Sequence, residues 1–405
     1  MVARIAIKDI CKIYDGPHAT PQKTNEGPVY LGIDAITDDG KVDPNQFSHL
    51  SEKDYIKWTK RVTPQYGDIV FSYEATLGRY ALIPKDFYGC LGRRLAVIRN
   101  ISSDIDTTWL YYYFRSAEWT NFIQSKIVKG STVNRISIED FPHYTIPRVP
   151  IETQKKIVDV LARIDRKIQI NDAINDNLEQ QAKLLYDYWF TQFDFPDKNG
   201  NPYRASGGQM EWNDVLNRHI PVGWKAKSLA ELMKKNTIAF DYTSTQPAID
   251  LSVMPSGSIA LSQLNTSDNF TTNLYQMKKG DILFGSIRPY LHKAGFAPCD
   301  GVVAGTVHSY SVKNENDYNF ALITVSRNAF FDYAVNVSSG TKMPVVSSDS
   351  ILAYKVPYNN EIVSRFNDIA LMETIASNVQ ENQKLIELRD WLLPMLMNGQ
   401  ASVED

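Results

Sequence analysis

Residues Pro150 to Phe190, PIETQKKIVDVLARIDRKIQINDAINDNLEQQAKLLYDYWF, decide the fold. After Pro150 the stretch contains neither Pro nor Gly, and its seam positions recur at alternating steps of four and three residues. This spacing predicts a long helix that packs against a second helix. A helix of about 40 residues would extend roughly 60 Å, which is longer than a small domain needs. The predicted seam consists of Ile157, Leu161, Ile164, Ile168, Asn171, Asn175, Leu178, Ala182, Leu185 and Trp189.

A partner helix is predicted near the C-terminus, where residues 371–396 read LMETIASNVQENQKLIELRDWLLPML. When the first stretch is shifted by 207 residues, Asn171 falls on Asn378 and Asn175 falls on Asn382. Asn in a helical seam lowers stability and fixes the register. Its recurrence at matching positions therefore argues against two amphipathic helices that are alike by chance. The second seam consists of Leu371, Ile375, Asn378, Asn382, Leu385, Leu392 and Leu396.

The composition is that of an ordinary globular protein of two or three domains, with 405 residues, 43% hydrophobic and 22% charged. No run of 18 apolar residues occurs, and the N-terminus has no apolar signal-peptide core, so we expect no membrane segment. The three cysteines, Cys11, Cys90 and Cys299, lie far apart in the chain. Such spacing indicates neither a disulfide framework nor a zinc site, and favours a cytoplasmic location.

The charge is unevenly distributed along the chain. The formal net charge is −3, but residues 1–150 carry +2 and residues 206–358 carry +1, whereas residues 359–405 carry −5. The acidic side chains are therefore concentrated on the predicted helices. This distribution permits DNA binding by the two larger segments, without establishing it.

The segments between the predicted helices resemble each other. GDILFGS, which begins at Gly280, repeats GDIVFS, which begins 213 residues earlier at Gly67. The stretch from Gly340 to Pro357 likewise repeats the stretch from Gly130 to Pro150, and the rest of the two segments has diverged. We therefore expect a twofold internal repeat of domain and helix, in which unlike surfaces are presented on a shared frame.

The predicted organisation is a mixed α+β (α/β) fold with two strand-rich domains and two long helices. Within the first domain we expect strands at Val29–Ile33, Ile69–Tyr73, Tyr80–Ile83 and Leu95–Ile98, and one helix at Thr108–Ser125. The boundaries are 1–150 for the first domain, 151–192 for the first helix, 193–222 for a connector, 223–358 for the second domain, and 359–405 for the second helix and tail.

No catalytic constellation is found in the sequence. Neither GxxxxGK[ST] nor GxGxxG occurs, the six His form no i,i+4 pair, and Asn201-Pro202-Tyr203 fits a turn better than a methyltransferase loop. We therefore predict a chain that is not an enzyme and binds no metal. Basic residues do alternate with aromatic ones at predicted loops, as in Arg79-Tyr80 and Arg288-Pro289-Tyr290. Arg can read guanine edges, and Lys and Ser/Thr can hold phosphates.

Several strings resemble the conserved regions of DNA specificity subunits of type I restriction–modification enzymes. They are IPRVPIETQKKIVDVLARIDRKIQIN, FDFPDKNGNPYRASGGQMEW and ENQKLIELRDWLLPMLMNGQ, while GDIVFSYEATLGR, GDILFGSIRPYLHK and GSTVNRIS look like that family's target-recognition domains. The resemblance spans the chain in the family's order. It implies two target-recognition domains separated by an antiparallel coiled coil, each reading one half of a bipartite, asymmetric DNA target.

The resemblance also implies partners. Two methyltransferase subunits would carry S-adenosylmethionine and methylate adenine, and restriction subunits would use ATP and Mg. The residues that match the family's DNA-binding loops or stand beside them are His18, Thr20, Arg79, Tyr80, Arg93, Arg94, Lys129, Ser131, Thr132, Asn134, Arg135, Arg288, Tyr290, His292, Lys293, Thr341 and Lys342. The second domain lacks the DGPHATP loop of the first, which leaves its contacts near residues 241–246 open. Two alternatives stay open: a coiled-coil interaction scaffold without a nucleic-acid role, and the specificity subunit of a methyltransferase-only system.

Overall fold

The computed structural model describes residues 3–130, 133–242, 244–368 and 371–401, and the side chains of all of these except residues 371 and 372. The chain forms two compact units. Unit 1 comprises Met1–Asp165 and Ile386–Asp405, and unit 2 comprises Arg166–Leu385. Each unit therefore holds one strand-rich domain and part of both long helices.

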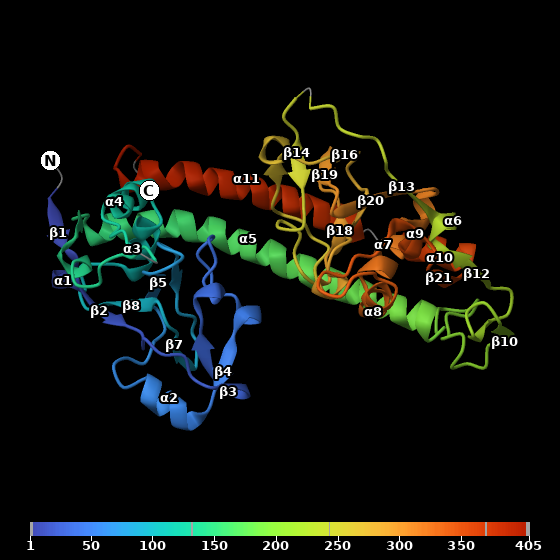
Figure 1. Ribbon diagram of the computed structural model, residues 1–405, viewed down its shortest axis with the longest axis horizontal. Coiled ribbons are helices and arrows are strands. Elements are labelled where there is room, and N and C mark those ends of the chain that lie inside the picture. Colours follow the sequence, from blue (N-terminus) through green and yellow to red (C-terminus); the bar gives the residue numbers. More distant parts are fainter. Residues whose placement is uncertain (1–2, 131–132, 243, 369–370, 402–405) are drawn as a thin grey trace. The chain divides into compact units, whose positions relative to one another are not determined.

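The long helices are α5, Ile151–Tyr186, and α11, Leu371–Met397. In each unit, part of α11 lies alongside part of α5 (Figure 1). In unit 2, Asn171 Nδ2 donates to Asn382 Oδ1 over 2.9 Å, and Asn378 Nδ2 donates to Asn175 Oδ1 over 2.8 Å. Residue numbers rise on one helix as they fall on the other, so the pair is antiparallel, as predicted.

The seam is buried largely as its spacing predicts. The buried members are Ile157, Leu161, Ile164, Ile168, Asn171, Asn175, Ala182, Trp189, Ile375, Asn382 and Leu396, and the half-buried ones are Leu178, Leu185, Asn378, Leu385 and Leu392. The side chain of Leu371 lies outside the described residues. In unit 1, Ile157 and Leu161 share a core with Leu393 and Leu396. Beyond Ala182 the seam of α5 packs into the domain core of unit 2, which also includes Ile375, Ala376 and Val379 of α11.

The domain of unit 1 is built on a four-stranded antiparallel sheet of order β2-β8-β5-β6 and a three-stranded sheet of order β4-β3-β7. The strands of the first sheet are β2 Cys11–Asp15, β8 Leu95–Asn100, β5 Ile69–Ser72 and β6 Tyr80–Leu82; those of the second are β4 Ser48–Leu50, β3 Lys23–Leu31 and β7 Gly89–Leu91. Strand β1, Arg4–Ala6, pairs with β9, Thr145–Pro147. The shorter helical elements are α1 Ile7–Ile10, η1 Ile33–Ala35, η2 Pro44–Gln46, α2 Glu52–Trp58 and η3 Phe141–His143.

The single helix predicted at residues 108–125 is wrong, because the segment forms two helices. These are α3, Thr107–Phe114, and α4, Ala117–Ser125. Ser116 has extended backbone angles, and its side chain accepts a hydrogen bond from Trp119 N as the N-cap of α4. A Ser at this position starts a new helix, and both helices still bury their aromatic faces in the core of unit 1.

The domain of unit 2 repeats this plan. Its sheets have the orders β13-β20-β17-β18 and β15-β14-β19-β16, and β12 pairs with β21. The strands are β12 Lys225–Ser228, β13 Met233–Lys235, β14 Pro247–Ile249, β15 Asn265–Thr266, β16 Leu274–Met277, β17 Ile282–Gly285, β18 Ala294–Phe296, β19 Gly301–Ala304, β20 Val307–Val312 and β21 Lys355–Tyr358. The helical elements are α6 Leu229–Leu232, η5 Ser267–Asn269, η6 Pro289–Leu291, η7 Glu315–Asp317, α7 Tyr318–Ser326, α8 Asn328–Asn336, α9 Ser348–Leu352 and α10 Asn360–Asn367.

The connector after α5 is part of unit 2. A π-helical turn, η4 Asp187–Thr191, ends the long helix, and the side chains of Phe193 and Phe195 are then buried in the core. The rest of the connector includes a hairpin of β10, Met210–Asn213, and β11, Arg218–Pro221. The aromatic residues Phe193 and Phe195 therefore dock this polar stretch on the second domain.

The internal repeat extends to the strand register. In β5 and β8, Ile69 lies opposite Ile98; in β17 and β20, Ile282 lies opposite Tyr310. Ile69 and Ile282 are 213 residues apart, the same offset as between the two Gly-Asp-Ile strings. The two glycines Gly89 and Gly301 correspond as well, because a Cβ on either would lie 2.3 Å from a carbonyl oxygen of the neighbouring strand. The segments that have diverged in sequence thus share one strand arrangement.

Candidate nucleic-acid interface

Two loops lie side by side in each domain. Loop A lies between the strand that begins at the Ile of the Gly-Asp-Ile string and the next strand. It comprises residues 74–79, between β5 and β6, in the first domain, and residues 287–293, between β17 and β18, in the second. Loop B comprises the described residues 128–130 and 133–135 in the first domain and residues 339–345 in the second. Bridges join Glu74 to Arg135 and Ile287 to Val345, so that loop A contacts loop B in the same way in both domains. These are the loops that hold most of the predicted DNA-binding residues.

Loop A turns through left-handed backbone at both ends. The φ angles are 66° at Ala75 and 77° at Gly78 in the first domain, and 52° at both Arg288 and His292 in the second. Such angles are unfavourable for residues other than Gly and cluster at functional sites. In the second domain the ring of His292 stacks on Phe331, with centroids 4.5 Å apart. The loop is thus held in one conformation by its surroundings.

A cation anchors loop A in each domain. Arg79 Nε donates to Asp38 Oδ1 over 2.6 Å, and Arg79 Nη1 donates to the carbonyl of Ile36 over 3.1 Å. At the equivalent position, Lys293 Nζ donates to the carbonyls of Leu251 and Met254 over 2.6 and 2.7 Å.

Both cations hold the segment that follows a strand, β3 in the first domain and β14 in the second. Burial lowers the pKa of Lys293, and Asp250 partly offsets this effect. Because their charged groups already make hydrogen bonds within the domain, Arg79 and Lys293 help to position loop A.

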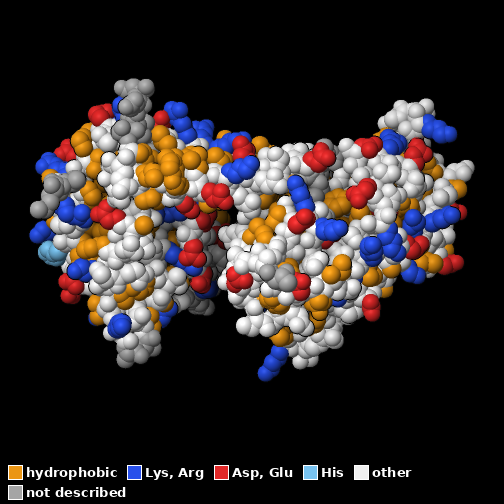
Figure 2. Space-filling model, turned by 90° about the horizontal axis from the view of Figure 1, so that it is seen from above, with side chains coloured by type: hydrophobic (Ala, Val, Ile, Leu, Met, Phe, Trp, Pro, Cys, Tyr) orange, Lys and Arg blue, Asp and Glu red, His pale blue; other side chains and the backbone are white. Residues whose placement is uncertain are grey.

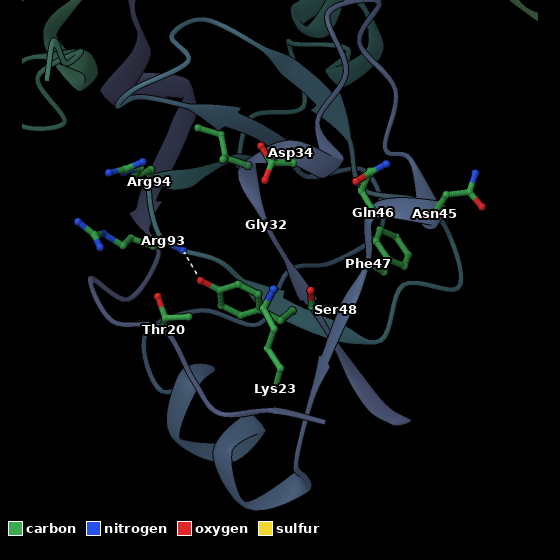
Figure 3. A pocket seen from close by; sticks show the side chains of 12 residues that line it. Thr20, Lys23, Gly32, Asp34, Asn45, Gln46, Phe47, Ser48, Arg93 and Arg94 are labelled. Carbon is green, nitrogen blue, oxygen red and sulfur yellow. Dashed lines mark hydrogen bonds between the residues drawn. The ribbon is translucent and has the colours of Figure 1, made fainter. Parts of the chain in front are cut away.

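The first domain also has a polar cavity of about 480 Å³. Arg93 and Arg94 line one edge, and Figure 3 shows both guanidinium groups pointing away from Asn45, Gln46 and Phe47 at the opposite edge. The backbone N–H of Arg93 donates to the hydroxyl of Tyr30 over 3.1 Å. Arg94 has a φ of 72°, and its Nε is buried without a hydrogen-bond partner among the described residues.

The structure places the predicted site residues in three classes. Exposed side chains are His18, Thr20, Arg93, Lys129, Asn134, Arg135, Arg288, Tyr290, Thr341 and Lys342; partly buried ones are Arg79, Arg94, His292 and Lys293. Ser131 and Thr132 lie outside the described residues. Only Tyr80 is fully buried, with 3% of its surface exposed.

The prediction that Tyr80 contacts DNA is wrong. Its ring stacks on Phe71 and Phe114, and its hydroxyl accepts a 2.8 Å hydrogen bond from Trp119 Nε1. Tyr80 is the first residue of β6, and its side chain points into the core, whereas Arg79, the last residue of loop A, is partly exposed.

Lys23, Asn45 and Gln46 line the cavity and were not identified from the sequence. They come from β3 and η2, which carry no motif, and only the pairing of β3 with β4 and β7 brings them beside Arg93 and Arg94. Near the exposed His18, Arg61 Nη1 donates to Asp15 Oδ1 over 2.8 Å.

The charged surface is mixed. On the face drawn in Figure 2, Lys and Arg side chains lie among Asp and Glu side chains, with apolar side chains between them. Within the described residues, no group of three or more His, Cys, Asp or Glu could hold a metal ion. No helix in the described part of the chain combines the length and apolar character needed to cross a bilayer.

Comparisons with known proteins find similarity to specificity subunits of type I restriction enzymes. Residues 2–180 match the family described as the type I restriction modification DNA specificity domain. The chain is 23% identical over 373 residues to the type I restriction enzyme MjaIX specificity subunit of Methanocaldococcus jannaschii, which covers 88% of this chain and 82% of that relative. Over most of its length the chain is therefore similar to specificity subunits of type I restriction enzymes.

Two further specificity subunits are similar to this chain over most of its length. The HindI specificity subunit of Haemophilus influenzae is 23% identical over 89% of this chain and 93% of its own. A crystal structure of the type I restriction-modification system S subunit from M. genitalium covers 97% of this chain and 95% of its own, with 14% identity and a TM-score of 0.47.

Proposed function

We propose that this chain is the DNA-reading subunit of a type I restriction–modification complex. Each recognition domain reads one half of a bipartite, asymmetric target, and the helix pair sets the spacer between the halves. The observation that carries this proposal is the internal repeat, in which two domains share strand order, register and loop anchors but differ in the exposed residues of their loops. Equivalent frames with unlike surfaces are suited to reading two unlike sequences.

The helix pair is also the proposed docking surface for two methyltransferase subunits. Large apolar side chains are exposed on it: Ile170, Ile174 and Leu184 on α5 are 47%, 41% and 70% exposed, and Leu388 and Trp391 on α11 are 43% and 57% exposed. Exposed apolar side chains grouped on one element favour a protein interface. The acidic C-terminal segment supports the same assignment, because its net charge of −5 would repel DNA.

The covalent chemistry belongs to the partners in this proposal. The methyltransferase subunits carry S-adenosylmethionine and methylate adenine, and a restriction subunit uses ATP and Mg. The specificity chain itself contributes no cofactor and no reacting group. Its task is to hold the duplex where a partner can act on it.

The spacer role is tested by lengthening the helices. Four residues inserted after Asn171 should change the spacer and leave both half-sites as they are. Altered half-sites with the original spacer, read by sequencing modified adenines, would refute the role. A sharper variant inserts seven residues after Asn175 and seven after Ser377. A whole heptad keeps the seam facing its partner, keeps both Asn pairs, and adds about 10 Å, equivalent to roughly 3 bp.

The DNA-binding role is tested by exchanging one domain. Residues 1–150 replaced by the corresponding domain of another family member should change one half-site only. A second measurement separates this function from a scaffold without a nucleic-acid role. The assembled complex should bind duplex DNA with an affinity that falls steeply as salt rises, whereas a pure scaffold would show no such dependence.

A further inference from the structure

The two domains share one arrangement of strands and loops, but their exposed cationic residues lie at different positions in it. The strand registers align Gly89 with Gly301, so that Arg93 and Arg94 correspond to Gly305 and Thr306. The hydrogen bonds agree, because Tyr73 N donates to the carbonyl of Arg94 where Ser286 N donates to the carbonyl of Thr306. The position that carries two arginines in the first domain therefore carries none in the second.

Loop A shows the opposite distribution. The bridge of Glu74 to Arg135 matches the bridge of Ile287 to Val345, which aligns Ala75 with Arg288. The interior of loop A is Ala-Thr-Leu-Gly in the first domain and Arg-Pro-Tyr-Leu-His in the second. The interior of loop A thus holds a long cationic side chain in the second domain and none in the first.

Arg288 has the features of a side chain held ready for an external partner. Its φ is 52°, its N–H donates to the carbonyl of Pro344 over 2.8 Å, and Pro289 restricts the next residue. Among the described residues, its guanidinium has no hydrogen-bond or ion-pair partner, and the side chain is exposed. Arg94 in the first domain is the other arginine with left-handed backbone. Each domain therefore places one arginine at a position where Gly would be less strained.

We infer that the two domains read their half-sites with different parts of the same frame. In the second domain Arg288 of loop A reads a guanine, and in the first domain Arg93 and Arg94, at the turn between β7 and β8, read their half-site. The planar guanidinium fits the O6 and N7 atoms of guanine with two hydrogen bonds, a pairing that Lys cannot reproduce. The inference deepens the proposed function and rests on it.

The decisive variant is Arg288→Gly. It removes the side chain and relieves the left-handed backbone, so it should unfold no more easily than the wild type. The assembled complex is given a pool of duplexes that is randomised at both half-sites, and the bound duplexes are sequenced. We expect one guanine in one half-site to lose about ten- to hundredfold of its preference, while the other half-site stays unchanged. An unchanged preference at every position would overturn the inference.

Three further variants separate base reading from phosphate binding. Arg288→Lys keeps the charge, so it should retain most of the affinity but lose the guanine preference; retention of both would mean that Arg288 holds a phosphate only. Arg94→Gly together with Arg93→Gly should relax the other half-site. Ala75→Gly, at the position that matches Arg288, should change neither half-site, and a relaxed base with this variant would contradict the division of roles.

The same experiment distinguishes failure of the inference from failure of the proposed function. If the wild-type complex enriches no sequence from the pool, the chain does not read DNA. If the wild type enriches a bipartite sequence and Arg288→Gly enriches the same one, the chain reads DNA by other residues.

Discussion

Asn171 Nδ2 donates a hydrogen bond of 2.9 Å to Asn382 Oδ1, and Asn378 Nδ2 donates one of 2.8 Å to Asn175 Oδ1. The internal repeat, with its offset of 207 residues, pairs Asn171 with Asn378 and Asn175 with Asn382, so the two bonds are equivalent. Donor falls on donor and acceptor on acceptor. The antiparallel helix pair in unit 2 therefore carries a local twofold relationship down to single hydrogen bonds. Asn382 also donates to Asp172 Oδ1 over 2.8 Å, and Glu381 accepts from both Asn171 and Lys167. A polar layer of this kind selects one register.

Asn171→Leu should destabilise unit 2 by about 1–3 kcal/mol, because Asn382, 2% exposed, keeps its polar group and loses a partner. The double variant Asn171→Leu with Asn382→Leu should recover much of this loss, since two apolar side chains suit a buried seam. Urea unfolding of the four proteins of this cycle measures the coupling. A double variant as unstable as the sum of the single ones would mean that the two amides do not interact.

The ion pair of Arg389 with Asp165 should contribute more than a surface pair. Arg389 Nη1 lies 3.0 Å from Asp165 Oδ1, their side chains are 11% and 22% exposed, and Tyr112 donates to the same carboxylate over 2.6 Å. Arg389→Met leaves the carboxylate without its cation, and we expect a loss of about 2 kcal/mol in the free energy of unfolding.

The matched control for this variant is Arg163→Met on the same helix pair. Arg163 lies 2.7 Å from Asp159, but the two side chains are 78% and 59% exposed. Solvent screens such a pair, so its loss should change the stability by less than about 0.5 kcal/mol. Equal effects of the two variants in chemical unfolding would contradict the role assigned to burial.

Tyr80→Phe tests the assignment of this residue to the core. The variant leaves the buried Trp119 Nε1 without its acceptor, so the free energy of unfolding should fall by about 1–2 kcal/mol. The preferred DNA sequence of the assembled complex should not change, because the hydroxyl faces Trp119. A relaxed half-site with unaltered stability would restore Tyr80 to the DNA-binding residues.

His308 should make stability depend on pH between about 4 and 6.5. Burial lowers the pKa of His308 to about 4, assisted by Lys235, and the hydrogen bond to the carbonyl of Val346 opposes this effect. Over this range the unfolded chain binds more protons than the folded one, so stability is complete above pH 6.5 and falls as the pH drops towards 4. The free energy of unfolding should fall by about 2 kcal/mol less in His308→Gln than in the wild type when the pH is lowered. The measurement compares the free energies of unfolding of both proteins at pH 7 and pH 4.5. The same pH dependence in both proteins would contradict the assignment.

The helix pair and the repeat could be predicted because they are encoded in spacing. The steps of four and three residues and the matching Asn positions identify the seam around Ile157 and Ile375, and a long helix has few other ways to bury it. The two Gly-Asp-Ile strings mark equivalent strands because each needs a Gly with positive φ, 83° at Gly67 and 88° at Gly280.

The recognition loops could not be predicted in the same detail, because their properties depend on contacts between distant segments. No local pattern shows that Arg79 and Lys293 are engaged by carbonyls and a carboxylate, while Arg93 and Arg288 extend into solvent. Arg94 and Arg288, both with left-handed backbone, likewise make backbone hydrogen bonds to residues distant in the sequence, Tyr73 and Pro344. The break between α3 and α4 is hard to predict for a simpler reason. The helical spacing of aromatic residues continues past Ser116, and this spacing hides the role of Ser116 as the N-cap of α4.

The paired anchors of loop A have a consequence for how such a protein diversifies. The interior of the loop has four residues in the first domain, 75–78, and five in the second, 288–292, yet the strands on either side keep the same register. Insertions and exchanges within this interior are absorbed between two fixed points and do not propagate into the sheets. In the proposed DNA-reading role, a few codon changes in this interior would therefore alter the recognised sequence while the sheets stay intact.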